Sequence, residues 1–208
     1  SGVVFGVATQ IVAEGVCSID AVDRGATVGV RWAHGPCELM NSVGVLKSFE
    51  LAQDYLKLCQ DESGKSNWQI PEFFAKQASN NQKWDFSYVD TEISNGIATI
   101  TINRPEAMNA LNETVIHQLG IAVDAVNSNN EVHTIVLDGA GKAFIAGADV
   151  KFFVDKIRSD SIPDIVEFTS NGHKVLNSIE NSPKTTIALT TGLALGGGLE
   201  LALCCDYR

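Results

Sequence analysis

The stretch Thr191–Asp206 reads TGLALGGGLELALCCD and decides how the second half of the chain is interpreted. Three consecutive glycines, Gly196–Gly198, interrupt a run that is otherwise almost wholly apolar. Residues without a Cβ let another group approach the backbone closely, or let φ become positive. The pattern from Leu199 to Cys205 is helical, so the glycines form a turn at a helix start. Free backbone N–H groups and the helix dipole favour negative charge there.

Glu200 is the only ionisable carboxylate in this helical pattern. On a helix that is apolar on every face we expect it to be buried. Burial favours the neutral form and raises the pKa, as acid–base chemistry near neutral pH often requires. The alternative is that the glycines form a tight strand-to-helix turn and that Glu200 reaches solvent. This stretch alone does not separate the two interpretations.

A second stretch, Lys142–Phe153, reads KAFIAGADVKFF and places three small residues, 146–148, just after a predicted buried strand. Small residues again leave the backbone open to close approach. If each stretch directs one N–H at a single oxygen, the two together form an oxyanion hole.

Three motifs in this order resemble the crotonase (enoyl-CoA hydratase/isomerase) superfamily. They are NRPEAMNAL at Asn103–Leu111, GKAFIAGADVK at Gly141–Lys151 and GLALGGGLELALCCD at Gly192–Asp206. The resemblance covers about residues 85–208 and implies part of a crotonase-like α/β fold, a ββα spiral. It also implies that the oxyanion hole consists of the N–H groups of Ala148 and Gly197.

The resemblance further implies that Glu200 is one of two glutamates that share acid–base catalysis, the second lying beyond Arg208. The partner is an acyl-CoA thioester, and the hydratase needs neither a cofactor nor a metal. Lys151 meets a CoA phosphate or covers the adenine, or else is a solvated surface lysine. Asp149 contacts the ligand or, as the alternative, caps the following helix. The implied CoA-binding residues are Ala107, Met108, Ala146, Gly147, Asp149, Val150 and Lys151.

Local patterns in residues 85–208 agree with this fold. Alternating β-branched runs at Phe86–Ile93 and Ile97–Ile102 flank Asn95-Gly96, a strong hairpin signal. Asn112 is expected to cap a helix, and Pro163 to open a longer one. Further strands are expected at 133–137 and 184–189. Strands that alternate with crossover helices predict a largely parallel sheet.

The N-terminal part reads as a small all-α domain over residues 1–64, with no strand expected before residue 84. Helical patterns cover 3–14, 19–28, 38–43 and 46–59. The order of Glu14-Gly15-Val16, Ile19-Asp20, and Gly35-Pro36 followed by Glu38-Leu39 resembles the C-terminal helical domain of 3-hydroxyacyl-CoA dehydrogenases. An unrelated helical cap is the alternative.

The resemblance implies that the chain is a fragment of a dehydrogenase–hydratase fusion, with the NAD-binding domain expected upstream. We assign no NAD-binding residue, because the chain contains no GxGxxG. Residues 65–84 are polar and are expected to be a linker with a short helix near Phe73–Gln77. Ser63–Ser66 imitates the end of a phosphate loop but is expected to be a surface loop.

Composition limits the class of protein. The 208 residues carry a formal net charge of −10, which argues against nucleic acid or an anionic membrane as partner. No apolar run reaches the ~18 residues of a transmembrane helix. Five cysteines without metal-ligand spacing favour reduced thiols in a cytoplasmic protein. The chain begins without Met, and we expect a fragment of a longer polypeptide that forms a homo-oligomer when complete.

These observations together predict an enoyl-CoA hydratase that adds water to a 2-enoyl-CoA to give a 3-hydroxyacyl-CoA, within a bifunctional enzyme. Two alternatives stay open. One is an enoyl-CoA isomerase of the same superfamily, and the other is a non-catalytic acyl-CoA-binding module.

Overall fold

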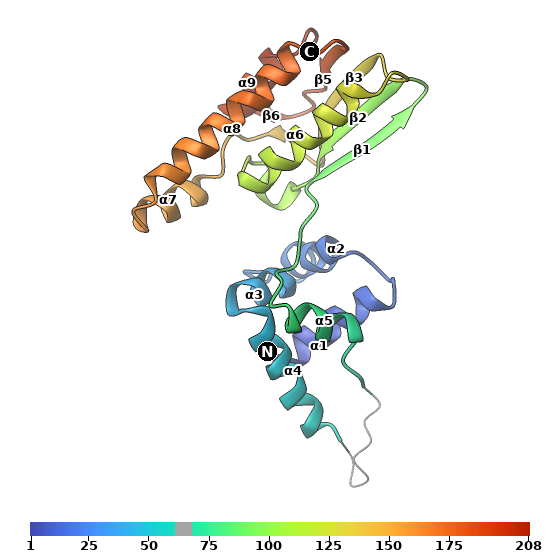
Figure 1. Cartoon of the computed structure of the whole chain (residues 1–208), viewed down its shortest axis with the longest axis vertical. Helices are drawn as coiled ribbons and strands as arrows, with labels where there is room; N and C mark the ends of the chain where they lie inside the picture. The colour runs from blue at the N-terminus through green and yellow to red at the C-terminus, as the bar shows by residue number, and fades with distance from the viewer. Residues whose placement is uncertain (61–67) are drawn as a thin grey trace. The chain divides into compact units, whose positions relative to one another are not determined.

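A computed structural model describes residues 1–60 and 68–208. The chain forms two compact units, Ser1–Phe86 and Ser87–Arg208 (Figure 1), and each unit is described by itself. The described part of the first unit contains helices and no strand, as its sequence predicts. Its helices are α1 (Gly2–Ala13), α2 (Ile19–Arg24), a π-helix over Gly25–Gly29, α3 (Pro36–Val43), α4 (Val45–Leu58) and α5 (Glu72–Ser79).

The second helix is shorter than predicted. It was expected to extend through Val28, but α2 ends at Arg24 and the chain continues as the π-helix. Glycines occupy both ends of this segment, and glycine weakens a regular helix because it loses the most backbone entropy on folding. The chain therefore forms a wider, π-helical turn over Gly25–Gly29.

A buried carboxylate joins α2 to α3. Asp23 is only 8% exposed, and its two oxygens accept hydrogen bonds from the N–H groups of Cys37 and Glu38, both at 2.7 Å. These are orphan donors at the start of α3, where Pro36 has no N–H to offer. Burial raises the pKa of Asp23, although the two backbone hydrogen bonds act in the opposite direction. Asp23 therefore caps α3 from a neighbouring helix.

The expectation of a linker over residues 65–84 is wrong from residue 68 onward. Helix α5 and the segment after it belong to the first unit, whose core includes Phe74, Ala78 and Trp84. The rings of Phe49 and Phe74 meet edge to face, with centroids 5.3 Å apart. A few aromatic side chains bury this segment although its overall composition is polar. The predicted surface loop Ser63–Ser66 lies outside the described residues.

The second unit contains a four-stranded sheet in the order β1-β2-β3-β5. Strands β1 and β2 are antiparallel, whereas β2–β3 and β3–β5 are parallel, so the predicted largely parallel sheet is confirmed. Asn95 and Gly96 both have positive φ, 50° and 76°, as a two-residue hairpin turn requires. The first strand begins at Val89, not at Phe86. The strands are β1 (Val89–Ser94), β2 (Ile97–Ile102), β3 (Thr134–Gly139) and β5 (Thr185–Ala188).

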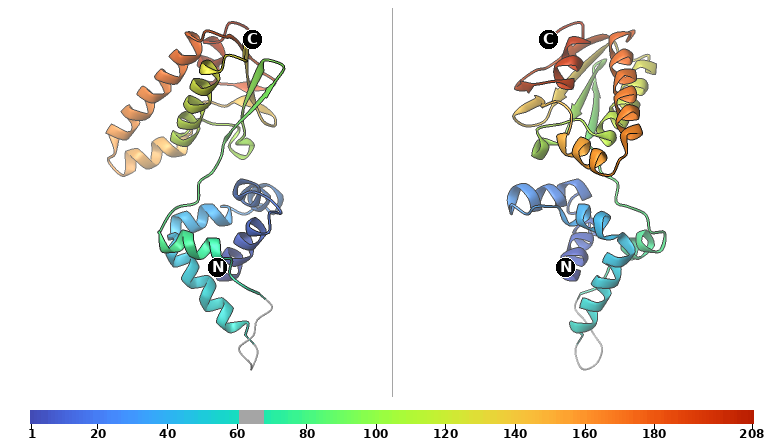
Figure 2. Two further views of the ribbon diagram at one scale, coloured as in Figure 1. Left: turned by 45° about the vertical axis from the view of Figure 1, so that its right-hand side comes forward. Right: turned by 90° about the vertical axis from the view of Figure 1, so that its left-hand side faces the viewer.

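Helices cover this sheet. Helix α6 packs on β1 and β2, and α8 lies beside α6 (Figures 1 and 2). Asn112 caps α6 as predicted, because its side-chain oxygen accepts the N–H of Val115 at 2.9 Å. The helices of this unit are α6 (Glu113–Ser128), α7 (Val150–Arg158), α8 (Ile162–Glu180) and α9 (Gly197–Leu203), with a 3-10 turn over Pro105–Ala107.

A second, two-stranded sheet positions the candidate site. Strands β4 (Ala143–Ile145) and β6 (Leu193–Ala194) pair in parallel. The carboxyl ends of parallel strands lie at the same edge, so the segments that follow β4 and β6 leave the sheet together. Phe144 and Ile145 are fully buried in the core of the unit, which fixes this edge.

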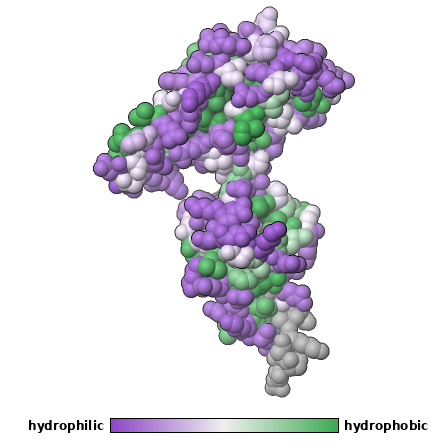
Figure 3. Space-filling view, in the orientation of Figure 1, coloured by the Kyte–Doolittle hydropathy of each residue, from purple (hydrophilic) through white to green (hydrophobic). Residues whose placement is uncertain are grey.

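Each unit also exposes apolar side chains (Figure 3), among them Val7 at 43% in the first unit and Ile121 at 57% in the second. None of the described helices is both long and apolar enough to cross a membrane. All five cysteines are free thiols; Cys37 and Cys205 are buried, whereas Cys59 is exposed. Burial raises the pKa of Cys205 to about 11, which keeps this thiol protonated at neutral pH.

Candidate active site

The two predicted loops lie against each other after β4 and β6. The N–H of Leu195 donates to the carbonyl of Ile145 at 3.1 Å. Gly147 lies so close to the second loop that a Cβ added to it would be 3.2 Å from the backbone oxygen of Leu195. Gly196 has a φ of 47°, and Gly198 has no room for a side chain because a Cβ there would collide with Ile145. The glycine run therefore allows both a positive φ, at Gly196, and the close approach of another segment, at Gly198.

The N–H groups of Ala148 and Gly197 are unpaired within the described part of the chain. Leu111 donates to the carbonyl of Gly147 and accepts from the N–H of Asp149, both at 2.8 Å. In a parallel bridge of this kind the flanking residues make the bonds, so the N–H of Ala148 points away from Leu111. Gly197 is the first residue of α9, where an N–H has no partner inside the helix.

One pocket of about 190 Å³ brings these groups together. Ala148, Gly197 and Glu200 all line it, although Ala148 is about fifty residues from the other two. The remaining lining is mostly apolar and comes from α6, α7, α8, α9 and Leu111, which precedes α6. It consists of Leu111, Ile116, Leu119, Phe153, Phe168, Thr169, Gly172, His173, Val175, Leu176 and Leu201.

The expected burial of Glu200 is wrong for the described chain, in which this side chain is exposed. Helix α9 buries Gly198, Leu201 and Ala202 but leaves its other side open. Leu199 and Leu203 on that side are 47% and 56% exposed. A helix that is apolar all round is therefore only half covered, and apolarity alone did not predict the environment of the carboxylate.

The predicted CoA-binding residues lie in or beside these loops, and none of the seven lines the candidate pocket. The N–H of Ala146 donates to the carbonyl of Met108 at 3.1 Å, which joins the loop containing Ala107 to the end of β4. Met108 and Val150 are 53% and 73% exposed, and Lys151 is also exposed. Gly147 is buried and Ala146 is half-buried. These residues offer a ligand mainly backbone and exposed side chains.

Asp149 has a structural role. One carboxylate oxygen accepts the N–H of Lys151 at 3.0 Å and caps α7, so the capping interpretation is confirmed. The other forms an ion pair with Arg104 Nη1 at 2.8 Å, and both side chains are less than a fifth exposed. Since both oxygens bind protein groups, the structure does not favour a contact between Asp149 and a ligand.

Asn109 is a positioning residue to which the sequence analysis gave no role. It is fully buried, and its Nδ2 lies 2.8–3.1 Å from the carbonyl oxygens of Ala140, Ala143 and Phe144. Its Oδ1 accepts the N–H of Arg104 at 2.9 Å. Met108 and Asn109 both adopt positive φ, 51° and 57°, so the loop is held in a sparsely populated conformation. The signal for this role in the sequence was the polar side chain of Asn109 between Met108 and Ala110.

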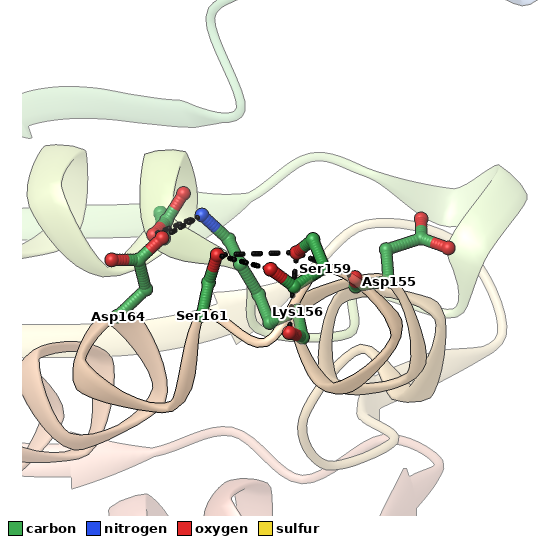
Figure 4. A network of polar contacts seen from close by, with 6 residues as sticks. Asp155, Lys156, Ser159, Ser161 and Asp164 are labelled. Atoms are coloured by element: carbon green, nitrogen blue, oxygen red, sulfur yellow. Dashed lines mark hydrogen bonds and ion pairs between the residues drawn. The ribbon is translucent and has the colours of Figure 1, made fainter.

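Phe153 on α7 and Phe168 on α8 form the aromatic wall of the pocket, and Phe152 packs behind them. The ring centroid of Phe168 lies 4.9 Å from that of Phe152 and 5.5 Å from that of Phe153. Figure 4 shows the polar contacts that hold the turn between these helices, including Lys156 Nζ to Asp164 Oδ2 at 2.6 Å. The hydrogen bond to Asp164 raises the pKa of Lys156. Lys156 also lies 3.6 Å from Glu113 on α6, so one ammonium connects three helices.

A larger hollow and a metal site are the two alternatives to this pocket. A larger hollow of about 660 Å³ lies between α6 and α8, but neither Ala148 nor Gly197 lines it. In the described ranges no three His, Cys, Asp or Glu side chains are grouped as a metal site. The smaller pocket is therefore the candidate active site.

Two unpaired N–H groups on adjacent loops, with a carboxylate at the same pocket, are the arrangement expected of a crotonase-like α/β protein. Residues 92–208, more than half of the chain, match the family described as enoyl-CoA hydratase/isomerase. The chain belongs to this family.

Curated relatives agree with this assignment. The chain is 44% identical over 113 residues to a crotonyl-CoA hydratase of Syntrophomonas wolfei, a match that covers 54% of this chain and 42% of the relative. It is 42% identical over 118 residues to the human mitochondrial methylglutaconyl-CoA hydratase, covering 56% of this chain and 34% of the relative. The chain thus spans less than half the length of these relatives.

Solved structures show the same fold. An enoyl-CoA hydratase/carnitine racemase from Magnetospirillum magneticum superposes with a TM-score of 0.55 at 36% identity, covering 60% of this chain and 46% of that chain. An enoyl-CoA hydratase from Bacillus halodurans gives 0.56 at 32% identity, covering 59% and 49%.

Proposed function

We propose that the protein is an enoyl-CoA hydratase, which adds water across the 2,3-double bond of an enoyl-CoA thioester to give a 3-hydroxyacyl-CoA. The observation that carries this proposal is the pair of unpaired N–H groups, on Ala148 and Gly197, that line the same pocket as Glu200. The named hydratases among the relatives support it.

The chemistry follows from where charge develops. When the oxygen of water attacks the β-carbon, the electrons of the double bond move toward the thioester and leave an enolate oxygen. The N–H groups of Ala148 and Gly197 hold that oxygen, and loss of one comparable donor costs about 3 kcal/mol. Glu200 takes part in proton transfer between water and the α-carbon. The family resemblance implies a second glutamate, beyond Arg208, that shares this work.

CoA binding is proposed for the loop segments beside the pocket, as the family resemblance implies. We assign the contacts to the backbone of Ala146 and Gly147, to Ala107 and Met108, and to Val150 and Lys151 on α7. Lys151 is exposed and free to reach a phosphate. Asp149 is left out of this set because Arg104 and the N–H of Lys151 occupy its carboxylate.

We further propose that the helical unit Ser1–Phe86 is the C-terminal domain of a 3-hydroxyacyl-CoA dehydrogenase. The sequence resemblance and the helix-only character of its described part support this proposal. In a fusion of this kind the dehydrogenase oxidises the 3-hydroxyacyl-CoA that the hydratase makes, and NAD binds to an upstream domain.

Turnover of the full-length protein tests the hydratase proposal. We expect loss of the enoyl-thioester absorbance of crotonyl-CoA, with 3-hydroxybutyryl-CoA as the product. Conversion of a 3-enoyl-CoA to its 2-enoyl isomer, without hydration, would replace the proposal with isomerase activity. Binding of crotonyl-CoA without any turnover would make the protein a non-catalytic acyl-CoA-binding module.

A further inference from the structure

We infer that the pocket takes short acyl chains, of about four to six carbons, and that Phe153 sets this limit together with Phe168. The inference rests on the proposed function, because it assumes that the thioester oxygen lies at the N–H groups of Ala148 and Gly197. It adds to that function the length of the acyl group that the site accepts.

The first support is the size of the pocket. Its volume is about 190 Å³. An apolar cavity of about 150 Å³ holds one benzene molecule, which has six carbons. A pocket only slightly larger therefore accommodates a short acyl chain, whereas a ten-carbon chain exceeds the space available.

The second support is the packed core that forms one side of the pocket. Ile116 and Leu119 on α6 are 6% and 0% exposed, and Phe168 on α8 is 8% exposed, so these three belong to the packed core. Because the core is close-packed, displacing these side chains would cost free energy. Phe153 on α7 is half-buried and forms the wall next to them, with its ring centroid 5.5 Å from that of Phe168.

The third support is the character of the open side. Thr169, His173 and Glu200 line the pocket there, and all three are exposed. A chain too long for the apolar end would continue past these polar groups into water. Each methylene placed in an apolar site improves binding by about fourfold, but one left in water adds nothing. The gain in affinity with chain length should therefore stop near six carbons.

The test measures dissociation constants of butyryl-, hexanoyl- and decanoyl-CoA for the full-length protein by calorimetry. These saturated thioesters are not hydrated, so binding is read apart from catalysis. We expect affinity to rise about fourfold per methylene from butyryl to hexanoyl. From hexanoyl to decanoyl we expect a total gain of less than about fourfold. A steady rise through decanoyl-CoA would overturn the inference.

Two variants assign the limit to Phe153. Phe153→Ala should extend the gain to decanoyl-CoA, raising its affinity relative to butyryl-CoA by at least about tenfold over the wild type, since several more methylenes become buried. Val154→Ala shortens a neighbouring side chain of α7 that does not line the pocket, and should leave that ratio unchanged. Phe153→Leu serves if the alanine variant does not fold. Equal ratios in the Val154 and Phe153 variants would contradict the inference.

The ratio of two dissociation constants does not depend on the fraction of protein that is folded. If the wild type shows the plateau but hydrates nothing, the proposed function fails and the length limit stands. If the full-length protein binds none of the three thioesters, both proposals fail.

Discussion

Replacing Gly197 with proline is expected to lower the kcat of hydration by about 10²–10³-fold, the usual cost of removing one oxyanion-hole donor. Proline has no N–H, so the change deletes the proposed donor itself. Gly197 is the first residue of α9, a position that accepts proline because its N–H makes no intrahelical bond. Steady-state kinetics of the full-length protein with crotonyl-CoA would measure the effect.

Gly197→Ala is the matched control for this prediction. Alanine keeps the N–H, and its Cβ would lie 3.2 Å from Leu111 Cδ1, the end of a flexible side chain that can yield. We expect this variant to keep most of the activity. If the alanine and proline variants lose activity equally, the effect belongs to packing and not to the N–H group.

Replacing Glu200 with glutamine is expected to lower kcat at least ~10²-fold, because the amide has nearly the same shape but cannot transfer the proton. The KM should change little, since the variant keeps the N–H groups of Ala148 and Gly197 and the proposed CoA contacts. Glu167→Gln is a suitable control: this carboxylate is exposed on α8 and lines the larger hollow, not the candidate site. A near-normal rate in the Glu200→Gln variant would remove Glu200 from the mechanism.

Local signals predicted the elements of the second unit well. The Asn95-Gly96 hairpin and the Asn112 cap depend on residues within a few positions of each other, and both are present. The strand Ile97–Ile102 has the predicted bounds, because its alternating β-branched pattern matches one buried face. The pairing of the two loops was not a local signal. It came from the motifs and from their likeness to a known family.

The failed expectations depend on packing partners distant in sequence. Glu200 was expected to be buried because its helix is apolar, but only one side of α9 meets the core. The linker was expected from polar composition, whereas three buried residues, Phe74, Ala78 and Trp84, attach it to the first unit. Asn109 was overlooked since its partners are backbone carbonyls more than thirty residues away.

The N–H groups of Ala148 and Gly197 are proposed to bind one thioester oxygen. Infrared difference spectra of full-length protein with carbonyl-¹³C-labelled butyryl-CoA test it most directly, because two hydrogen bonds polarise a carbonyl and weaken its stretch. We predict that the carbonyl band moves to lower frequency on binding to the wild type, and moves less on binding to the Gly197→Pro variant. A band that stays at its solution frequency in the wild-type complex would contradict the claim.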